Sequence, residues 1–118
     1  MTTDIELICT PGYASSVRHV DRWARAAVFA RYGLTEPRRY DPDGAVVDHL
    51  VPLELGGSND FTNLWPQSEH ATGLDAATKD RLENRLHALV CAGELPIAEA
   101  QHEIAADWIA AYRRYVGQ

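Results

Sequence analysis

The sequence has few basic residues and no long apolar segment. Its 118 residues include 11 lysines and arginines against 17 acids, which gives a formal net charge of −6. Non-specific affinity for nucleic acid comes mainly from basic side chains that neutralise phosphates, so this charge argues against a nucleic-acid substrate without excluding one. No apolar run is long enough to cross a bilayer, which argues against a membrane protein.

The amino terminus also lacks the basic head and apolar stretch of a signal peptide, so the sequence as written predicts a cytoplasmic protein. Only two cysteines are present, Cys9 and Cys91, and they do not by themselves identify a redox compartment. In the cytosol they would remain reduced, buried thiols. The length and a hydrophobic content of 46% predict one domain over residues 1–118, as a monomer or weak dimer.

The most informative segment places Asp48 and His49 at the end of a short apolar run. An acid beside a histidine can hold a divalent cation with one side chain and activate water with the other. The runs 45–47 and 61–65 predict two strands, and the residues of 56–60, Asn59 among them, are typical of a turn. An isolated Asp-His pair is more often an exposed or capping pair, so the surrounding pattern decides its interpretation.

A third element, a helix, is predicted after Asp75, which is a plausible N-cap. Apolar residues then recur with helical periodicity at positions 82, 86, 89 and 90, and the helix is expected to end near Gly93. At about 100° per residue, one row of side chains follows the edge of the apolar stripe, and a second row points further toward solvent. The first row is Lys79, Glu83 and His87, and the second is Asp80 and Asn84.

Two further helices are expected to flank these elements. The first begins after Ser15 or Ser16 and runs toward Gly33, and the last begins near Pro96 and runs through Tyr112. Their aromatic residues fall at the spacing of core positions, which favours packing over the stacking of nucleic-acid bases. These residues are Trp23, Trp108 and Tyr112.

The segment around Asp48 and His49, with Gly56-Gly57 and an Asn63-Leu64-Trp65-Pro66 block, resembles the HNH family of nucleases. The later blocks 79–87 and 90–93 extend the resemblance to a subgroup of small bacterial proteins. The resemblance implies an α+β fold, a ββα-metal finger over about residues 45–92 that consists of a two-stranded hairpin and a helix, flanked by N-terminal and C-terminal helices. It implies that Asp48 binds the metal, His49 is the general base, and Asn63 ties the loop together and orients the histidine.

The chain also departs from this family. Many members carry two Cys-x-x-Cys pairs that bind a structural zinc, and two cysteines cannot supply them. The third letter of the motif is not matched, so the second metal ligand comes from the helix: Glu83 or His87 is preferred, and Asp80 competes. Lys79 is a candidate contact to the substrate phosphate. The alternatives are an ordinary ion pair between Lys79 and Glu83, and a hydrogen-bonded His87 at the helix edge.

Basic residues cluster on the first predicted helix, where Arg18, Arg22 and Arg25 share a face that Arg31, Arg38 and Arg39 extend. This face is a candidate substrate-binding surface, and the alternative is a solvated face paired with acids such as Asp21. Surface or packing roles are expected for His19, His70 and His102.

Together, these features predict an endonuclease that uses one divalent cation to hydrolyse phosphodiester bonds, with DNA as the preferred nucleic acid. Mg²⁺ or Mn²⁺ suits an oxygen-rich site, and Zn²⁺ or Ni²⁺ becomes admissible if His87 binds. A finger that binds nucleic acid without cleaving it, and a toxin nuclease that an immunity protein binds, remain alternatives. Cys9 and Cys91 lie in blocks that resemble those of exported relatives, which would allow secretion and a disulfide between them.

Overall fold

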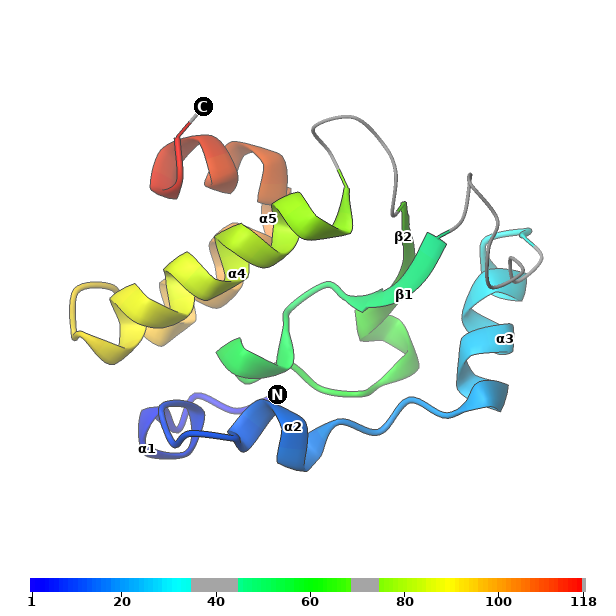
Figure 1. Cartoon of the computed structure of the whole chain (residues 1–118), viewed down its shortest axis with the longest axis horizontal. Helices are drawn as coiled ribbons and strands as arrows, with labels where there is room; N and C mark the ends of the chain where they lie inside the picture. The colour runs from blue at the N-terminus through cyan, green and yellow to red at the C-terminus, as the bar shows by residue number, and fades with distance from the viewer. Residues whose placement is uncertain (35–44, 69–74, 118) are drawn as a thin grey trace.

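The computed structural model describes residues 1–34, 45–68 and 75–117, and this part of the chain has an α+β fold. Five helices surround a two-stranded hairpin, with two short 3₁₀ turns, η1 and η2, between the strands (Figure 1). The elements are α1 (Ile5–Ile8), α2 (Tyr13–Val17), α3 (Arg22–Arg31), β1 (Ala45–His49), η1 (Leu53–Leu55), η2 (Phe61–Asn63), β2 (Leu64–Ser68), α4 (Ala76–Cys91) and α5 (Ile97–Tyr115). The expected α+β class is confirmed. None of the described helices is both long enough and apolar enough to cross a membrane.

The hairpin pairs β1 with β2 in antiparallel register, with Asp48 opposite Trp65 and His49 opposite Leu64. The prediction of a strand over 61–65 was wrong for its first three residues, which form η2. The backbone N–H of Asn63 donates to the carbonyl oxygen of Asp60 at 2.8 Å, and this turn-type hydrogen bond takes the place of strand pairing there. The second strand therefore starts at Leu64 and places His49 at the closed end of the ladder.

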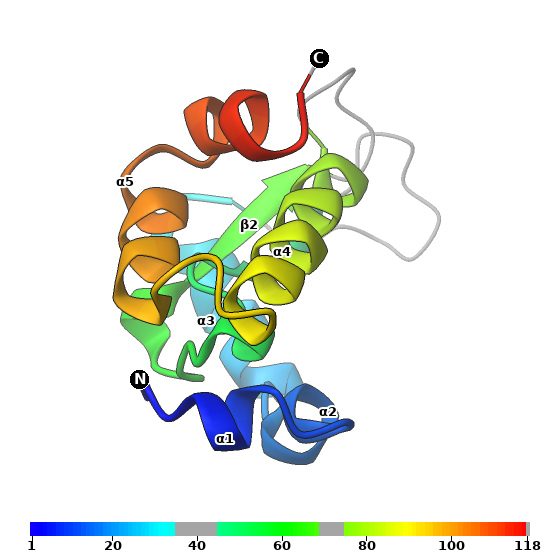
Figure 2. The same cartoon turned by 90° about the vertical axis from the view of Figure 1, so that its left-hand side faces the viewer.

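Helix α4 follows the sequence pattern closely. The carboxylate of Asp75 accepts a hydrogen bond from the backbone N–H of Thr78 at 2.9 Å, which confirms the predicted N-cap. Leu82 and Leu86 are fully buried, and α4 and α5 pack side by side over much of their length (Figures 1 and 2). The main core consists of Val51, Leu55, Leu82, Leu86, Val90, Leu95, Ala100, Ile104, Trp108 and Ala111.

The last helix is not continuous. Asp107 has an extended backbone, with φ −164° and ψ 91°, and its carboxylate accepts a hydrogen bond from the N–H of Ala110 at 3.1 Å. Asp107 thus caps a second helical segment, and Figure 2 shows the change of direction between the two parts of α5. The bend keeps Trp108 buried and Tyr112 packed against the core, which confirms packing for these two aromatics.

The single helix expected between Ser15 and Gly33 is two helices, α2 and α3, because the chain is extended at Arg18 (φ −66°, ψ 123°). Asp21 caps the second of them through a hydrogen bond from the N–H of Ala24 at 2.8 Å. This break turns Trp23 outward, where 75% of its surface is exposed, so the predicted packing role was wrong for this residue. Helix α3 packs against both strands of the hairpin.

A disulfide and hydrogen bonds of the backbone hold the amino-terminal segment against the rest of the chain. Cys9, after α1, forms a disulfide with Cys91, the last residue of α4, so the pairing that the family resemblance allowed is confirmed and the reduced pair is not. The side-chain amide of Gln101 donates to the carbonyl oxygens of Thr2 and Leu55 at 2.7 and 2.9 Å. The N–H of Thr2 donates to the Gly56 carbonyl at 2.9 Å, so Thr2 and Gln101 both contact the loop after β1.

Two glycines permit this loop to pack so closely. A Cβ on Gly57 would lie 1.8 Å from the carbonyl oxygen of Val51, and one on Gly56 would lie 2.2 Å from the carbonyl oxygen of Thr2. Both obstacles are backbone atoms that cannot rotate away. The Gly-Gly pair, expected as part of a turn, is therefore also a position of close backbone contact.

Gly57→Ala is expected to lower the free energy of unfolding by more than about 3 kcal/mol, because the added methyl overlaps fixed backbone. Gly93→Ala is the matched control: Gly93 has φ +77° but open space around it, and an alanine there should cost about 1–2 kcal/mol. Urea denaturation of the oxidised variants measures both changes. Equal losses would contradict the close contact at Gly57.

Candidate active site

Strand β1 and helix α4 bring four of the predicted site residues together around one ammonium group. Lys79, the only lysine of the sequence, is completely buried. Its Nζ donates to the backbone carbonyl oxygen of His49 and to Oε2 of Glu83, both at 2.8 Å, and lies 2.8 Å from Oδ2 of Asp48. The predicted helix edge therefore faces the end of β1.

The position of Lys79 differs from that of a residue that contacts substrate. Its Nζ is enclosed by three oxygens and reaches no solvent, so in this conformation it does not offer a contact to a phosphate. The expected ion pair between Lys79 and Glu83 is present, and it is buried rather than exposed. Removing one partner of a buried charge destabilises the fold, because the remaining charge stays desolvated. Lys79 fixes α4 to the end of β1 that carries Asp48 and His49.

Three carboxylates, those of Asp48, Asp80 and Glu83, lie near this single ammonium. Burial raises the pKa of Glu83 to about 7, with a further increase from the Asp48 carboxylate and an opposing decrease from Lys79. Burial also raises the pKa of Asp80, again with a contribution from Asp48. Oδ2 of Asp48 is buried, and it lies 2.8 Å from the ammonium of Lys79. This excess of negative charge would be relieved by a cation.

His49 is buried, with 5% of its surface exposed, and its ring is held by Asn59. Oδ1 of Asn59 lies 3.0 Å from Nε2 of His49, while the amide nitrogen of Asn59 donates to the carbonyl oxygen of Val17 at 2.7 Å. Because the amide nitrogen is engaged elsewhere, its oxygen faces the ring and requires a proton on Nε2. The neutral imidazole then has its lone pair on Nδ1, which is the atom that can accept a proton.

The surroundings of His49 favour this neutral form. Burial lowers its pKa below the ordinary 6.5, and the positive charges of Arg18 and Lys79 lower it further. The hydrogen bond to Asn59 and the charge of Asp48 act in the opposite direction without reversing the shift. At neutral pH the ring is therefore uncharged and able to act as a base.

Asn63 ties the loop after β1 together, in the manner that the family resemblance implies. Its Oδ1 accepts from the N–H of Val51 at 2.9 Å, and its amide nitrogen donates to the carbonyl oxygens of Val51 and Ser58 at 2.9 and 2.8 Å. It does not bond to His49. Its influence on the histidine passes through the loop, which carries Asn59 to the ring.

Asn59, expected only as a turn residue, is a functional candidate that the sequence pattern did not indicate. The side chain joins three segments: it contacts His49 at the end of β1, donates to Val17 in α2, and accepts from the N–H of His19 at 3.3 Å. These contacts span 40 and 42 residues of sequence on the N-terminal side. A Ser-Asn-Asp stretch after two glycines gives no local sign of such contacts.

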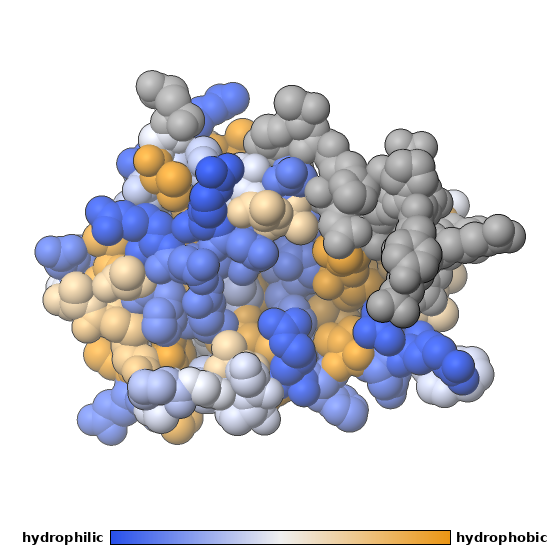
Figure 3. Space-filling model, in the orientation of Figure 1, coloured by the Kyte–Doolittle hydropathy of each residue, from blue (hydrophilic) through white to orange (hydrophobic). Residues whose placement is uncertain are grey.

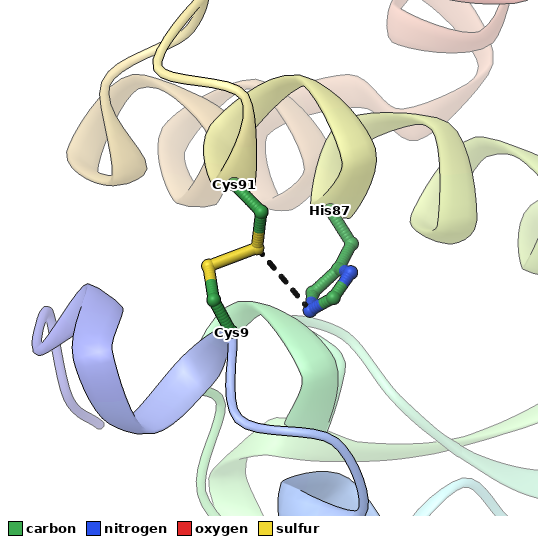
Figure 4. Close-up of side chains that lie close together, drawn as sticks. All are labelled: Cys9, His87 and Cys91. Carbon is green, nitrogen blue, oxygen red and sulfur yellow. Dashed lines mark hydrogen bonds between the residues drawn. A yellow bond between two sulfur atoms is a disulfide. The ribbon is translucent and has the colours of Figure 1, made fainter.

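His87 is not part of this group. Its Nε2 lies 3.1 Å from the carbonyl oxygen of Ile8 and 3.6 Å from Sγ of Cys91, which places the ring beside the disulfide (Figure 4). Among the described residues, the ligand atoms of Cys9, His87 and Cys91 form a closer group, within 4.8 Å of one another, than those of the three carboxylates. The sequence row Lys79, Glu83 and His87 is therefore divided between two places.

The predicted basic surface is present only in part. Arg18 lines a hollow with Glu54, Asp80 and Glu83 and is close enough to His49 to lower its pKa. Arg22 and Arg25 are exposed on α3, and the guanidinium of Arg22 lies 5.4 Å from the ring centre of Trp23. The face that carries α4 is mostly hydrophilic (Figure 3). Arg38, Arg39 and His70 lie outside the described residues.

Comparisons with known proteins identify no relative of this chain. A scan against models of protein families, a search of curated proteins and a search of solved structures each returned no match. What the chain does is accordingly inferred from Asp48, His49 and the side chains around them.

The hydrogen bond between Asn59 and His49 has a measurable consequence. Asn59→Leu is expected to lower the pKa of His49 further, because the substitution removes an acceptor that stabilises the protonated ring. The leucine side chain offers no replacement for that acceptor. Asn59→Asp is expected to raise the pKa, because a carboxylate would then face Nε2. NMR titration of the His49 ring in metal-free protein measures both shifts. A ring that titrates identically in the two variants would contradict the contact.

Proposed function

We propose that this chain is a divalent-metal-dependent endonuclease of the HNH type, with a ββα-metal finger formed by β1, β2 and α4, that hydrolyses phosphodiester bonds in DNA. The observation that carries the proposal is the environment of His49. The ring is buried, its pKa is lowered, and it is held through Nε2, which leaves Nδ1 as the nitrogen that accepts a proton. It lies next to Asp48 at the end of a strand, within a loop that Asn63 holds together.

In this function His49 would remove a proton from the attacking water through Nδ1. A general base must be unprotonated at the operating pH, and the lowered pKa of His49 favours this form at neutral pH. Asn59 keeps the ring in the required tautomer. Lys79 positions the backbone of His49 by donating to its carbonyl oxygen, so it is a positioning residue rather than a catalytic one.

The residues that would hold the cation are Asp48 together with a carboxylate of α4. Oδ2 of Asp48 and Oε2 of Glu83 both lie 2.8 Å from the ammonium of Lys79, and Asp80 lies nearby. Carboxylate oxygens of this kind fit a hard cation such as Mg²⁺ or Mn²⁺. Glu83 is the preferred second ligand and Asp80 the competing one. Bound there, the ion would stabilise negative charge on the phosphate and on the leaving oxygen.

The surface formed by Arg18, Arg22, Trp23 and Arg25 is the proposed contact to DNA. These side chains are exposed on α3 and on the segment before it, and Arg18 is electrostatically coupled to His49 and Asp80. Arginines supply the phosphate contacts that a net charge of −6 otherwise disfavours. Trp23 is exposed, with the guanidinium of Arg22 5.4 Å from its ring centre, and it offers a face on which a base can stack.

His49→Ala is expected to reduce plasmid cleavage by about 10²- to 10⁴-fold in Mg²⁺ or Mn²⁺, because it removes the general base. The rate of the parent chain should already be at its plateau near neutral pH and should fall as the pH drops through the lowered pKa of His49. His102→Ala, on the exposed side of α5, is the control and should cleave normally.

Circular dichroism of the His49→Ala variant confirms that the fold is retained. Cleavage at the parental rate by that variant would rule out the assignment of the base. A DNA band shift that persists in EDTA, with no cleavage in any of Mg²⁺, Mn²⁺ or Zn²⁺, would instead identify a binding module.

A second experiment concerns the metal ligands. Asp48→Asn and Glu83→Gln are each expected to weaken Mn²⁺ binding by at least about tenfold and to reduce cleavage in parallel, because each removes a carboxylate charge from the site. His87→Gln should leave the Mn²⁺ affinity unchanged, since this ring lies beside the disulfide. Isothermal titration calorimetry measures the affinities. If Asp80→Asn weakens binding and Glu83→Gln does not, the helix ligand is Asp80.

A further inference from the structure

A second group of ligand atoms lies at the other end of α4. Cys91 is the last residue of that helix, His87 is one helical turn before it on the same side, and Cys9 follows α1. Figure 4 shows the two sulfur atoms joined in the disulfide, with the imidazole directed toward them. The three ligand atoms lie within 4.8 Å of one another. Nothing in the proposed nuclease site uses any of these residues.

One distance in this group, between Sγ of Cys91 and Nε2 of His87, matches the distance between two ligands of a tetrahedral zinc site. With Zn–S bonds of about 2.3 Å and Zn–N bonds of about 2.0–2.1 Å, a tetrahedral angle places sulfur and nitrogen roughly 3.6 Å apart. Sγ of Cys91 and Nε2 of His87 are 3.6 Å apart. By the same geometry the two sulfurs would lie roughly 3.8 Å apart, which a covalent disulfide does not allow. The site therefore requires that the disulfide be broken.

We propose that reduction of the Cys9–Cys91 disulfide creates a binding site for one Zn²⁺, with both thiolates and Nε2 of His87 as ligands and water as the fourth. A dithiol reductant supplies the two electrons: it becomes a cyclic disulfide, the S–S bond of the protein breaks, and two thiols form. Zinc then displaces the two thiol protons, which pass to solvent. The cation replaces the covalent link between α1 and α4.

The surroundings of the group permit this exchange. Cys91 is exposed, so a soluble reductant can reach its sulfur. His87 is half-buried and already positioned by the contact between Nε2 and the carbonyl oxygen of Ile8 at 3.1 Å. When Nε2 of His87 binds zinc, its proton moves to Nδ1 and the hydrogen bond to the carbonyl oxygen of Ile8 is lost. The site contains two sulfurs and one nitrogen, so it selects a softer cation than the carboxylates near Asp48 do.

Titration with Co²⁺, a spectroscopic substitute for Zn²⁺, tests the proposal. The chain is reduced with a phosphine, desalted without oxygen, and titrated with Co²⁺, because only thiolate ligands give an intense sulfur-to-cobalt charge-transfer band. The band should saturate at one Co²⁺ per chain and disappear when Zn²⁺ is added. The oxidised chain should give no such band.

Single substitutions identify the ligands. Cys9→Ser and Cys91→Ser should each abolish the saturable band, and His87→Gln should weaken Co²⁺ binding about tenfold or more and change the visible spectrum. His102→Gln is the matched control for loss of an imidazole and should behave as the parent chain does. Asp48→Asn should also leave the band unchanged, which separates this site from the proposed nuclease site.

Circular dichroism accompanies each titration, so that the result is decisive even if reduction unfolds the chain. In that case Zn²⁺ should restore helix content in the parent chain and not in Cys9→Ser. The proposal is overturned if the reduced parent chain shows no charge-transfer band, if His87→Gln binds as tightly as the parent, or if one Co²⁺ joins two chains.

Discussion

The buried ammonium of Lys79 is the interaction on which the arrangement of the site depends. It joins the first turns of α4 to the end of β1 through the carbonyl oxygen of His49 and the carboxylate of Asp48, and it pairs with Glu83 within α4. Loss of one partner from such a buried group costs about 3–5 kcal/mol, because the remaining charges stay desolvated. The same contacts place the backbone of His49 and concentrate negative charge around one point. The contacts of Lys79 therefore serve both the packing of α4 on β1 and the geometry of the candidate active site.

The two main ionisable groups of the site have opposite effects on stability as pH changes. The pKa of Glu83 is raised from 4.5 to about 7, so its protonation stabilises the fold below pH 4.5 and this contribution is lost as the pH rises through 7. The pKa of His49 is lowered from 6.5, so its contribution is present above pH 6.5 and is lost as the pH falls through the lowered value. The two groups therefore act on stability in opposite directions as the pH changes.

Helix α4 connects two chemically different groups of side chains. Its first half carries Lys79, Asp80 and Glu83 toward β1, where oxygen ligands prevail, and its last turns carry His87 and Cys91 toward α1, where sulfur and nitrogen prevail. The amino-terminal segment contacts both groups: Cys9 bonds to Cys91, and Val17 binds Asn59, which holds His49. A segment with short helices and few buried residues thus connects the disulfide to the histidine of the candidate active site.

The sequence by itself determined the elements whose signals are local. The Asp75 cap, the buried face of α4, the position of Asp48 and His49 at a strand end, and the loop-binding role of Asn63 follow from capping, periodicity and motif. The tertiary structure decided the rest. It assigned Asn59 to His49, moved His87 to the disulfide and exposed Trp23, because each outcome depends on how segments far apart in sequence pack together. A helical row such as Lys79, Glu83 and His87 fixes which side chains share a face, but only the packing of the helix against β1 at one end and α1 at the other determines what each of them meets.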